Sequence, residues 1–168
     1  FRRAVLDRYA GTVLGRQELD AEILEDLPGA LVRMKDIAAS RVDAAPELDL
    51  VVVAVDPAGT GTGDEAGIVV VGRGAVDRHA YVLADLSGRM SARQTGLTAW
   101  GALYQYGASH IVYEDNFGKQ WLRDGLIDAY ADHHHLDANE RADVRELQGV
   151  GSGPYKMLAK VTAQHGKK

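Results

Sequence analysis

The feature of this 168-residue chain that most constrains its fold is an unbroken apolar run, Leu50 to Val55, which ends in Asp56. An apolar residue at every position is typical of a β-strand buried on both faces. Two more strand-like segments follow, Gly67–Arg73 and Ala80–Leu86, separated by turns rich in Gly, Thr and Asp. These short connections predict three antiparallel strands.

The second half of the chain alternates helical and strand-like segments. The expected elements are a helix over Ser91–Tyr106, a strand over His110–Asp115, helices over Gly118–Tyr130 and from Asp137 to about Leu147, and a strand over Lys156–Ala163. A long helical crossover favours a strand parallel to the first one. The predicted fold is therefore an α/β domain, with three antiparallel strands and then helix-connected parallel strands in one mixed sheet flanked by helices.

The N-terminal part has a different character. It contains helical stretches, including a short helix around Val32–Ala39, and then a linker over Asp43–Asp49. A chain of this length can bury one ordinary core. We therefore predict that residues 1–45 form a leader and linker and that residues 46–168 form the folded domain.

The overall composition excludes several classes of protein. A net charge of −5 provides no general basic field for nucleic acid, so any such binding has to come from local patches. The absence of cysteine excludes disulfides and thiolate metal sites and fits a reducing cytoplasm. The longest apolar run is too short to span a bilayer, so no membrane role is expected.

Two carboxylates are the best candidates for chemistry. Asp56 ends the first strand and Glu114 ends the strand expected to lie parallel to it, so both are predicted at the edge of the sheet where α/β folds place their ligands. Two adjacent carboxylates repel each other unless a divalent cation neutralises them, and Mg²⁺ or Mn²⁺ is the natural choice. Such ions hydrolyse phosphodiesters in many two-metal nucleases. The competing interpretation is that each residue simply caps a turn.

Other acidic residues could contribute to the same site. Asp64 and Glu65 lie in the loop after the first strand and could add a metal ligand, although a solvated acidic turn explains them equally well. Asp85, near the end of the third strand, could also face the cluster. Asp115 is expected on the face opposite to Glu114, because side chains alternate along a strand.

Basic residues near the starts of two helices could contact DNA phosphates. They are Arg89, Arg93, Lys119 and Arg123, and the alternative is that they are only solvated. The glycine-rich loop after Asp56 lacks P-loop spacing and leads into a strand, which argues against nucleotide binding of that kind. The run His133–His135 is more typical of a solvated helix end than of a metal site.

Segments spread over most of the chain together carry a family resemblance. They are Val53–Ala58, Asp64–Val70, Tyr81–Gly88, Ile111–Asn116 and Val161–Lys167, with Tyr9–Leu24 upstream. In this order they resemble the nuclease domain of the large terminase subunit of tailed phages, preceded by the stretch that links it to the ATPase motor. Residues 1–45 would then be the end of the ATPase region and its linker.

The resemblance implies a ribonuclease H-like fold and a metal-dependent endonuclease that cuts concatemeric double-stranded DNA. It implies two Mg²⁺ or Mn²⁺ ions held by Asp56 and Glu114, with Asp64 or Asp85 as further ligands. The expected partners are double-stranded DNA and, in the full-length protein, the portal protein and the small terminase subunit. The expected location is the bacterial host cytoplasm.

The chain departs from the family pattern at both ends. The family's third catalytic Asp follows a further helical region, and its ATPase core precedes the linker. The domain is therefore expected to be incomplete at its C-terminus, to hydrolyse no ATP and to cut DNA weakly or not at all.

Two other interpretations compete with the nuclease. The first is a noncatalytic fragment that docks DNA or a packaging protein through the same surface, which the absent third carboxylate favours. The second is another enzyme with ribonuclease H-like topology, such as an integrase, a junction resolvase or an actin-like ATPase in which Asp56 would face nucleotide phosphates.

Overall fold

The computed structural model describes residues 33–56, 65–114, 120–147 and 152–161. Contacts within the chain divide it into two compact units, Phe1–Ala44 and Ala45–Lys168. In the first unit the described part contains helix α3, Met34–Ala39, which has no buried residue and ends at Ser40. No helix in the described ranges is long and apolar enough to cross a membrane.

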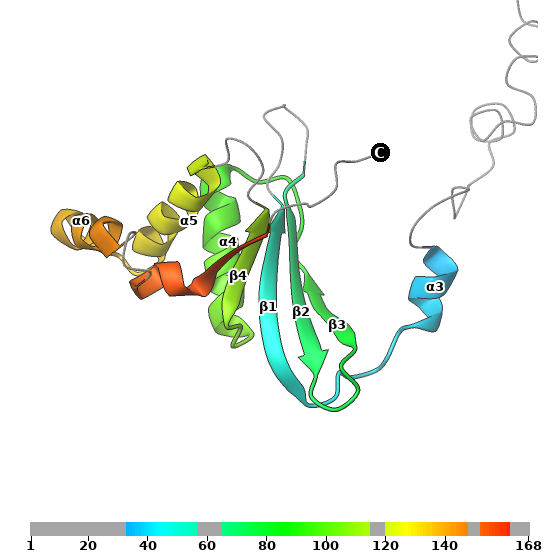
Figure 1. Ribbon diagram of the computed structural model, residues 1–168. Helices are drawn as coiled ribbons and strands as arrows, with labels where there is room; N and C mark the ends of the chain where they lie inside the picture. Colours follow the sequence, from blue (N-terminus) through cyan, green and yellow to red (C-terminus); the bar gives the residue numbers. More distant parts are fainter. Residues whose placement is uncertain (1–32, 57–64, 115–119, 148–151, 162–168) are drawn as a thin grey trace, which may run out of the picture. The chain divides into compact units, whose positions relative to one another are not determined.

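The second unit is built on a mixed sheet of five strands in the order β3-β2-β1-β4-β5 (Figure 1). The strands are β1 Leu48–Asp56, β2 Gly67–Gly74, β3 Ala80–Asp85, β4 His110–Glu114 and β5 Leu158–Val161. β2 pairs antiparallel with both β1 and β3, whereas β4 pairs parallel with both β1 and β5. The predicted mixed α/β sheet is confirmed.

Three α-helices connect the parallel strands. They are α4 Ala92–Gln105, α5 Gln120–His133 and α6 Ala138–Glu146. Capping boxes begin α4 at Ser91 and α6 at Asp137, where the side chain of the cap accepts backbone N–H bonds that the first turn leaves unpaired. The predicted start of the last strand was wrong, because a 3₁₀ helix (η2, Gly153–Met157) with proline in its first turn precedes β5.

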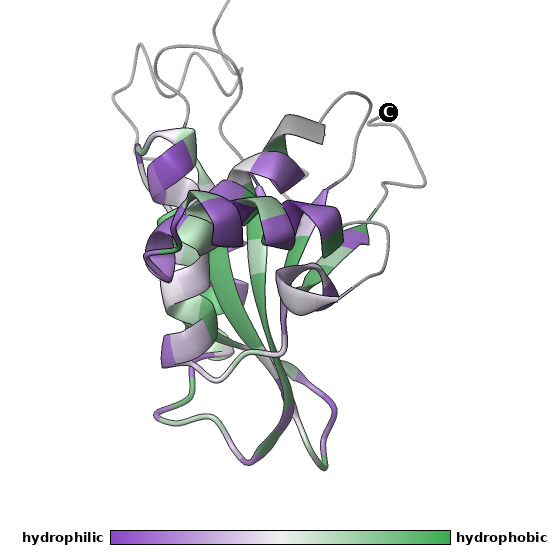
Figure 2. Cartoon of the chain, turned by 90° about the vertical axis from the view of Figure 1, so that its left-hand side faces the viewer, coloured by the Kyte–Doolittle hydropathy of each residue, from purple (hydrophilic) through white to green (hydrophobic). Residues whose placement is uncertain are grey.

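The core lies between the sheet and α4, with α5 packed against α4. Figure 2 shows the apolar strands, in green, behind the helices. Trp100 of α4 is fully buried, and its indole N–H donates to the carbonyl of Leu126 in α5 at 2.7 Å. The largest buried side chains also include Ile68, Val53 and Ile111 from three neighbouring strands. Trp100 thus joins α4 to α5 by a hydrogen bond and packs in the core against the sheet.

The prediction that β1 is buried on both faces was wrong. Val53 and Val55 are 0% and 4% exposed, whereas Val52 and Ala54, which alternate with them, are only partly buried. The same alternation runs along β2 and β4. The helices cover one face, and in the described part of the chain the other face carries small apolar side chains that remain accessible. We call this second face the open face.

Candidate functional site

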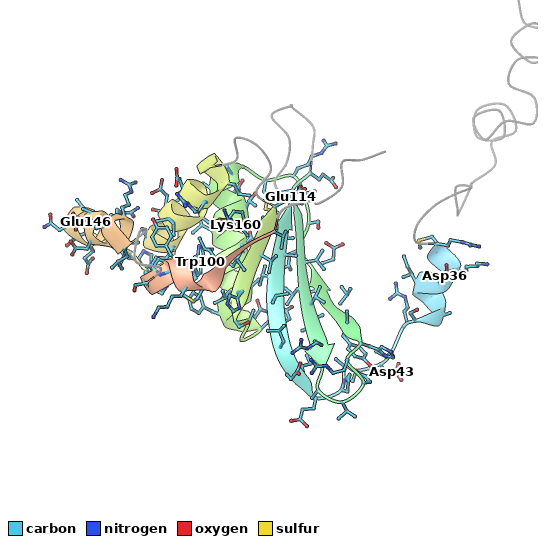
Figure 3. All side chains as sticks on the ribbon, in the orientation of Figure 1. Asp36, Asp43, Trp100, Glu114, Glu146 and Lys160 are labelled. Atoms are coloured by element: carbon cyan, nitrogen blue, oxygen red, sulfur yellow. The ribbon has the colours of Figure 1, made fainter. Side chains whose placement is uncertain are left out.

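The structure brings Asp56 and Glu114 together on neighbouring strands. Val55 of β1 lies opposite Tyr113 of β4 in the parallel register. The next residues along the two strands are Asp56 and Glu114, whose strands lie about 4.8 Å apart. Val55 and Tyr113 are buried toward the helices. Because side chains alternate, Asp56 and Glu114 both belong to the open face, and Figure 3 labels Glu114 at that end of β4.

A shallow hollow of about 420 Å³ lies at this place on the sheet. Its lining residues are Ala54, Val55, Asp56, Gly67, Val69, Val112, Tyr113, Glu114 and Val161. The two carboxylates are the acidic groups of this lining, and most of the other side chains are apolar. A small charged ligand in this hollow would therefore meet both carboxylates on a largely apolar surface that is open to solvent.

Two neighbouring carboxylates are a donor set that can contribute oxygen ligands to one hard divalent cation. Mg²⁺ is commonly bound through one or two carboxylates, with waters and substrate phosphates completing an octahedron of oxygens. Within the described ranges, no three acidic or histidine side chains converge closely enough to hold an ion by themselves. A second ion would therefore need oxygen ligands from elsewhere.

Asp85 lies on the open face but away from the pair. It is opposite Val69 of β2, and Val69 is opposite Ala54 of β1, so β2 separates Asp85 from β1 by two strand spacings, about 10 Å. The hydroxyl and the backbone N–H of Ser87 hydrogen-bond to the carboxylate and lower the pKa of Asp85. The structure thus gives Asp85 a local partner and does not bring it to Asp56 and Glu114.

The acidic loop after β1 is described only at its end. Asp64, a predicted ligand, lies outside the described residues, and so does Asp115. Glu65 is exposed, and the Nε atom of Arg89 lies 3.8 Å from its Oε1 atom. That ion pair is solvated on both sides, so it contributes little to stability and leaves both groups able to exchange partners.

The predicted DNA-contacting cations lie in different environments. Arg89 is 75% exposed. Arg93 donates from Nε to Asp132 of α5 at 2.7 Å, so a phosphate would have to compete with this carboxylate. Arg123 is 24% exposed, with its Nε 3.7 Å from Asp124, and Lys119 lies outside the described residues. Each of the three described arginines thus lies beside a carboxylate with which a DNA phosphate would have to compete.

The run His133–His135 ends α5 in a cluster of rings. The rings of Tyr104 and His133 are stacked with centroids 5.2 Å apart, and the Tyr104 hydroxyl lies 2.8 Å from Nε2 of His134. Partial burial, followed by the charges of His133 and His135, lowers the pKa of His134. The three histidines are exposed, as predicted, and the rings of His133 and His134 also pack on tyrosine.

Sequence reasoning missed Gly67 as part of the candidate site. It lies directly opposite Asp56 in the antiparallel register and lines the hollow. A glycine at the start of a predicted strand was the available signal, but the strand register that places it beside Asp56 is not visible in the sequence.

The sequence was compared with profiles of known protein families and with curated proteins, and neither comparison found a match. The carboxylate pair and the hollow around it are therefore the features from which a function has to be inferred.

Proposed function

We propose that the second unit is a divalent-metal-dependent endodeoxyribonuclease domain with a ribonuclease H-like fold, akin to the nuclease of phage large terminase subunits. The observation that carries this proposal is the position of Asp56 and Glu114, side by side on parallel strands and on the same face. The order of strands, two antiparallel pairs followed by helix-connected parallel strands, is compatible with that fold.

The two carboxylates have a simple role in the proposed reaction. Their oxygens hold Mg²⁺ or Mn²⁺ at the C-terminal ends of β1 and β4, and the repulsion between the two carboxylates is relieved when the ion is bound. A bound ion supplies a water molecule acidified toward hydroxide and a positive charge for the leaving oxygen of a phosphodiester. The hollow beside the pair leaves room for the DNA backbone.

The lining of the hollow also suggests how DNA is recognised. Ala54, Val69, Val112 and Val161 have no side-chain hydrogen-bond donor or acceptor with which to read a base edge. Contacts to phosphate and sugar position a protein on DNA without giving sequence specificity. The proposed enzyme therefore cuts double-stranded DNA without sequence readout at this site.

The remaining parts of the proposal concern ligands and partners. Asp64 is the proposed source of further oxygen ligands for the second ion of a two-metal site. The proposed phosphate contacts are Arg89, Arg93, Lys119 and Arg123. Arg93 would exchange its present partner, Asp132, for a phosphate. In a full-length terminase, the partners would be concatemeric DNA, the portal protein and the small terminase subunit, in the cytoplasm of a bacterial host.

The decisive experiment is a calorimetric titration of Mn²⁺ into the parent chain and into Asp56→Asn and Glu114→Asn variants, with plasmid nicking followed in parallel. Loss of one ligand should weaken Mn²⁺ binding by about tenfold or more. Asp85→Asn is the matched control, because it removes a carboxylate from the same face at a distance from the pair. An affinity unchanged in Asp56→Asn and Glu114→Asn, or no Mn²⁺ binding by the parent, would overturn the metal site.

A noncatalytic docking module is the second candidate function. It is favoured by the fact that two, and not three, acidic residues converge among those described. Such a module would bind a DNA duplex equally well with and without Mn²⁺ and would leave plasmid intact. A thermal shift with a nucleotide in the absence of DNA would instead favour an actin-like ATPase.

A further inference from the structure

Strand β2 contains three glycines, although glycine weakens a strand and is usually present for a reason. Two of them have a steric reason within the fold. A Cβ atom at Gly72 would lie 2.5 Å from Cδ1 of Leu48, and one at Gly74 would overlap Oδ1 of Asp77. A side chain at either position would therefore have to displace Leu48 or Asp77.

Gly67 has no such reason in the described part of the fold. A Cβ atom there would lie 3.6 Å from the Cβ atom of Asp56, which is an ordinary van der Waals contact. In the part of the chain that the structure describes, Gly107 and Gly153 have positive φ and Gly67 does not. No register shift interrupts its pairing with Asp56. Among the described residues, neither packing nor backbone geometry requires a glycine at position 67.

The position of Gly67 suggests a different reason. Gly67 and Glu114 flank Asp56 in one row across β2, β1 and β4. Side chains in a strand stand roughly perpendicular to the sheet, so any side chain at position 67 would rise from the open face next to the Asp56 carboxylate. It would occupy the hollow in which the other ligands of a bound ion have to lie. Glycine in a strand commonly marks a close approach of a ligand.

We propose that Gly67 determines access to the site, because its missing side chain leaves the opening through which a phosphodiester of DNA reaches an ion held by Asp56 and Glu114. This inference rests on the proposed nuclease function. It assigns to Gly67 the admission of the substrate, whereas the two carboxylates bind the ion.

The test compares Gly67→Ala and Gly67→Val with the parent chain. Three quantities are measured: Mn²⁺ affinity by calorimetry, Mn²⁺-dependent binding of a fluorescent DNA duplex together with plasmid nicking, and the melting temperature. Valine should raise the melting temperature by a few degrees, since it favours strands far more than glycine does. It should keep the Mn²⁺ affinity within about threefold of the parent but lower duplex binding and nicking by about tenfold or more.

Alanine should lower duplex binding and nicking by an intermediate amount, since only its Cβ atom enters the hollow. The matched control is Ala80→Val, which also ends in a valine but at an exposed position on the same face, opposite Arg73 and far from the hollow. This control should bind and nick DNA like the parent. If the valine variant does not fold, a loss of duplex binding in the alanine variant decides in favour of the proposal, and no loss decides against it.

The remaining outcomes separate this inference from the proposed function. Parent-like duplex binding and nicking in Gly67→Val would overturn the role of Gly67 and leave the metal site standing. Loss of Mn²⁺ binding in both Gly67 variants would make Gly67 part of the ion-binding geometry and would also overturn it. A parent that binds Mn²⁺ but no duplex would refute the role of Gly67 in DNA access and leave the metal site standing. A parent that binds no Mn²⁺ would refute both proposals.

Discussion

At the scale of single residues, Asp132 shows how one carboxylate can join three helices. It lies on α5 and accepts hydrogen bonds from Arg93 of α4 at 2.7 Å and from Arg141 of α6 at 2.8 Å. The hydrogen bonds from Arg141 and Arg93 lower the pKa of Asp132 below its ordinary value of 3.8. The ionised form is therefore the one that the folded state favours.

Asp132→Asn should destabilise the protein at neutral pH by about 0.5–1 kcal/mol, since the ion pairs are partly solvated. Because the folded pKa is lower than the unfolded one, the contribution of Asp132 is complete above pH 3.8 and is lost as the pH falls further through the folded value. Urea denaturation at pH 7 and at pH 3 should thus show a difference between parent and variant that shrinks in acid.

The control for this prediction is Asp128→Asn, which removes a more exposed carboxylate that is paired with Arg145. It should have a smaller effect at neutral pH. A difference between parent and Asp132→Asn that stays constant down to pH 3 would contradict the assigned ion pairs.

At the scale of elements, α4 and α5 pack closely against each other in the helical layer. It depends on Gly96, where a Cβ atom would lie only 2.5 Å from the Cβ atom of Ala129. Small residues on both helices allow this approach, which brings Leu126 into reach of the Trp100 indole. The start of α4 is therefore held by packing as well as by its capping box.

Gly96→Ala should destabilise the domain by about 1–3 kcal/mol, because overpacking outweighs the better helix propensity of alanine. Gly101→Ala in the same helix is the matched control, since a Cβ atom there meets nothing within 4 Å. The control should be neutral or stabilising by up to about 1 kcal/mol. Thermal unfolding of both variants measures the difference, and equal stabilisation by the two alanines would rule out the close helix contact.

At the scale of the whole molecule, the helices of the second unit cover one face of the sheet. The candidate site lies on the open face, at the C-terminal ends of β1 and β4. Strand order places β1 at the centre, between an antiparallel and a parallel neighbour. Asp56 can therefore have Gly67 on one side and Glu114 on the other. A ligand bound there would contact three strands of the native sheet, so its binding is coupled to folding of the domain.

Mn²⁺ should therefore stabilise the parent against thermal unfolding. A ligand that binds only the native state at a concentration of about 100 times its Kd adds about 2.7 kcal/mol. The rise in melting temperature should disappear in Asp56→Asn and persist in Asp85→Asn. A rise of equal size in the parent and in Asp56→Asn would show that Mn²⁺ stabilises the protein through some other site.

Local features of the fold could be predicted from the sequence. The strands, the helices and the mixed sheet depend on nearby residues or on the length of a connection, and both are visible in the chain. Asp56 and Glu114 could be identified as strand-end carboxylates for the same reason. Two predictions were wrong. An apolar run was taken to mean that β1 is buried on both faces, and the last strand was started too early, within the helical turn before β5.

The tertiary structure decided which of these residues meet. Pairing of β1 with β2 and β4 placed Gly67 and Glu114 beside Asp56, while β2 separated Asp85 from them. By itself, the sequence determined the elements and the carboxylates at their ends. Neighbours across the sheet depend on strand register, and a shift of one residue moves every side chain of a strand to the other face.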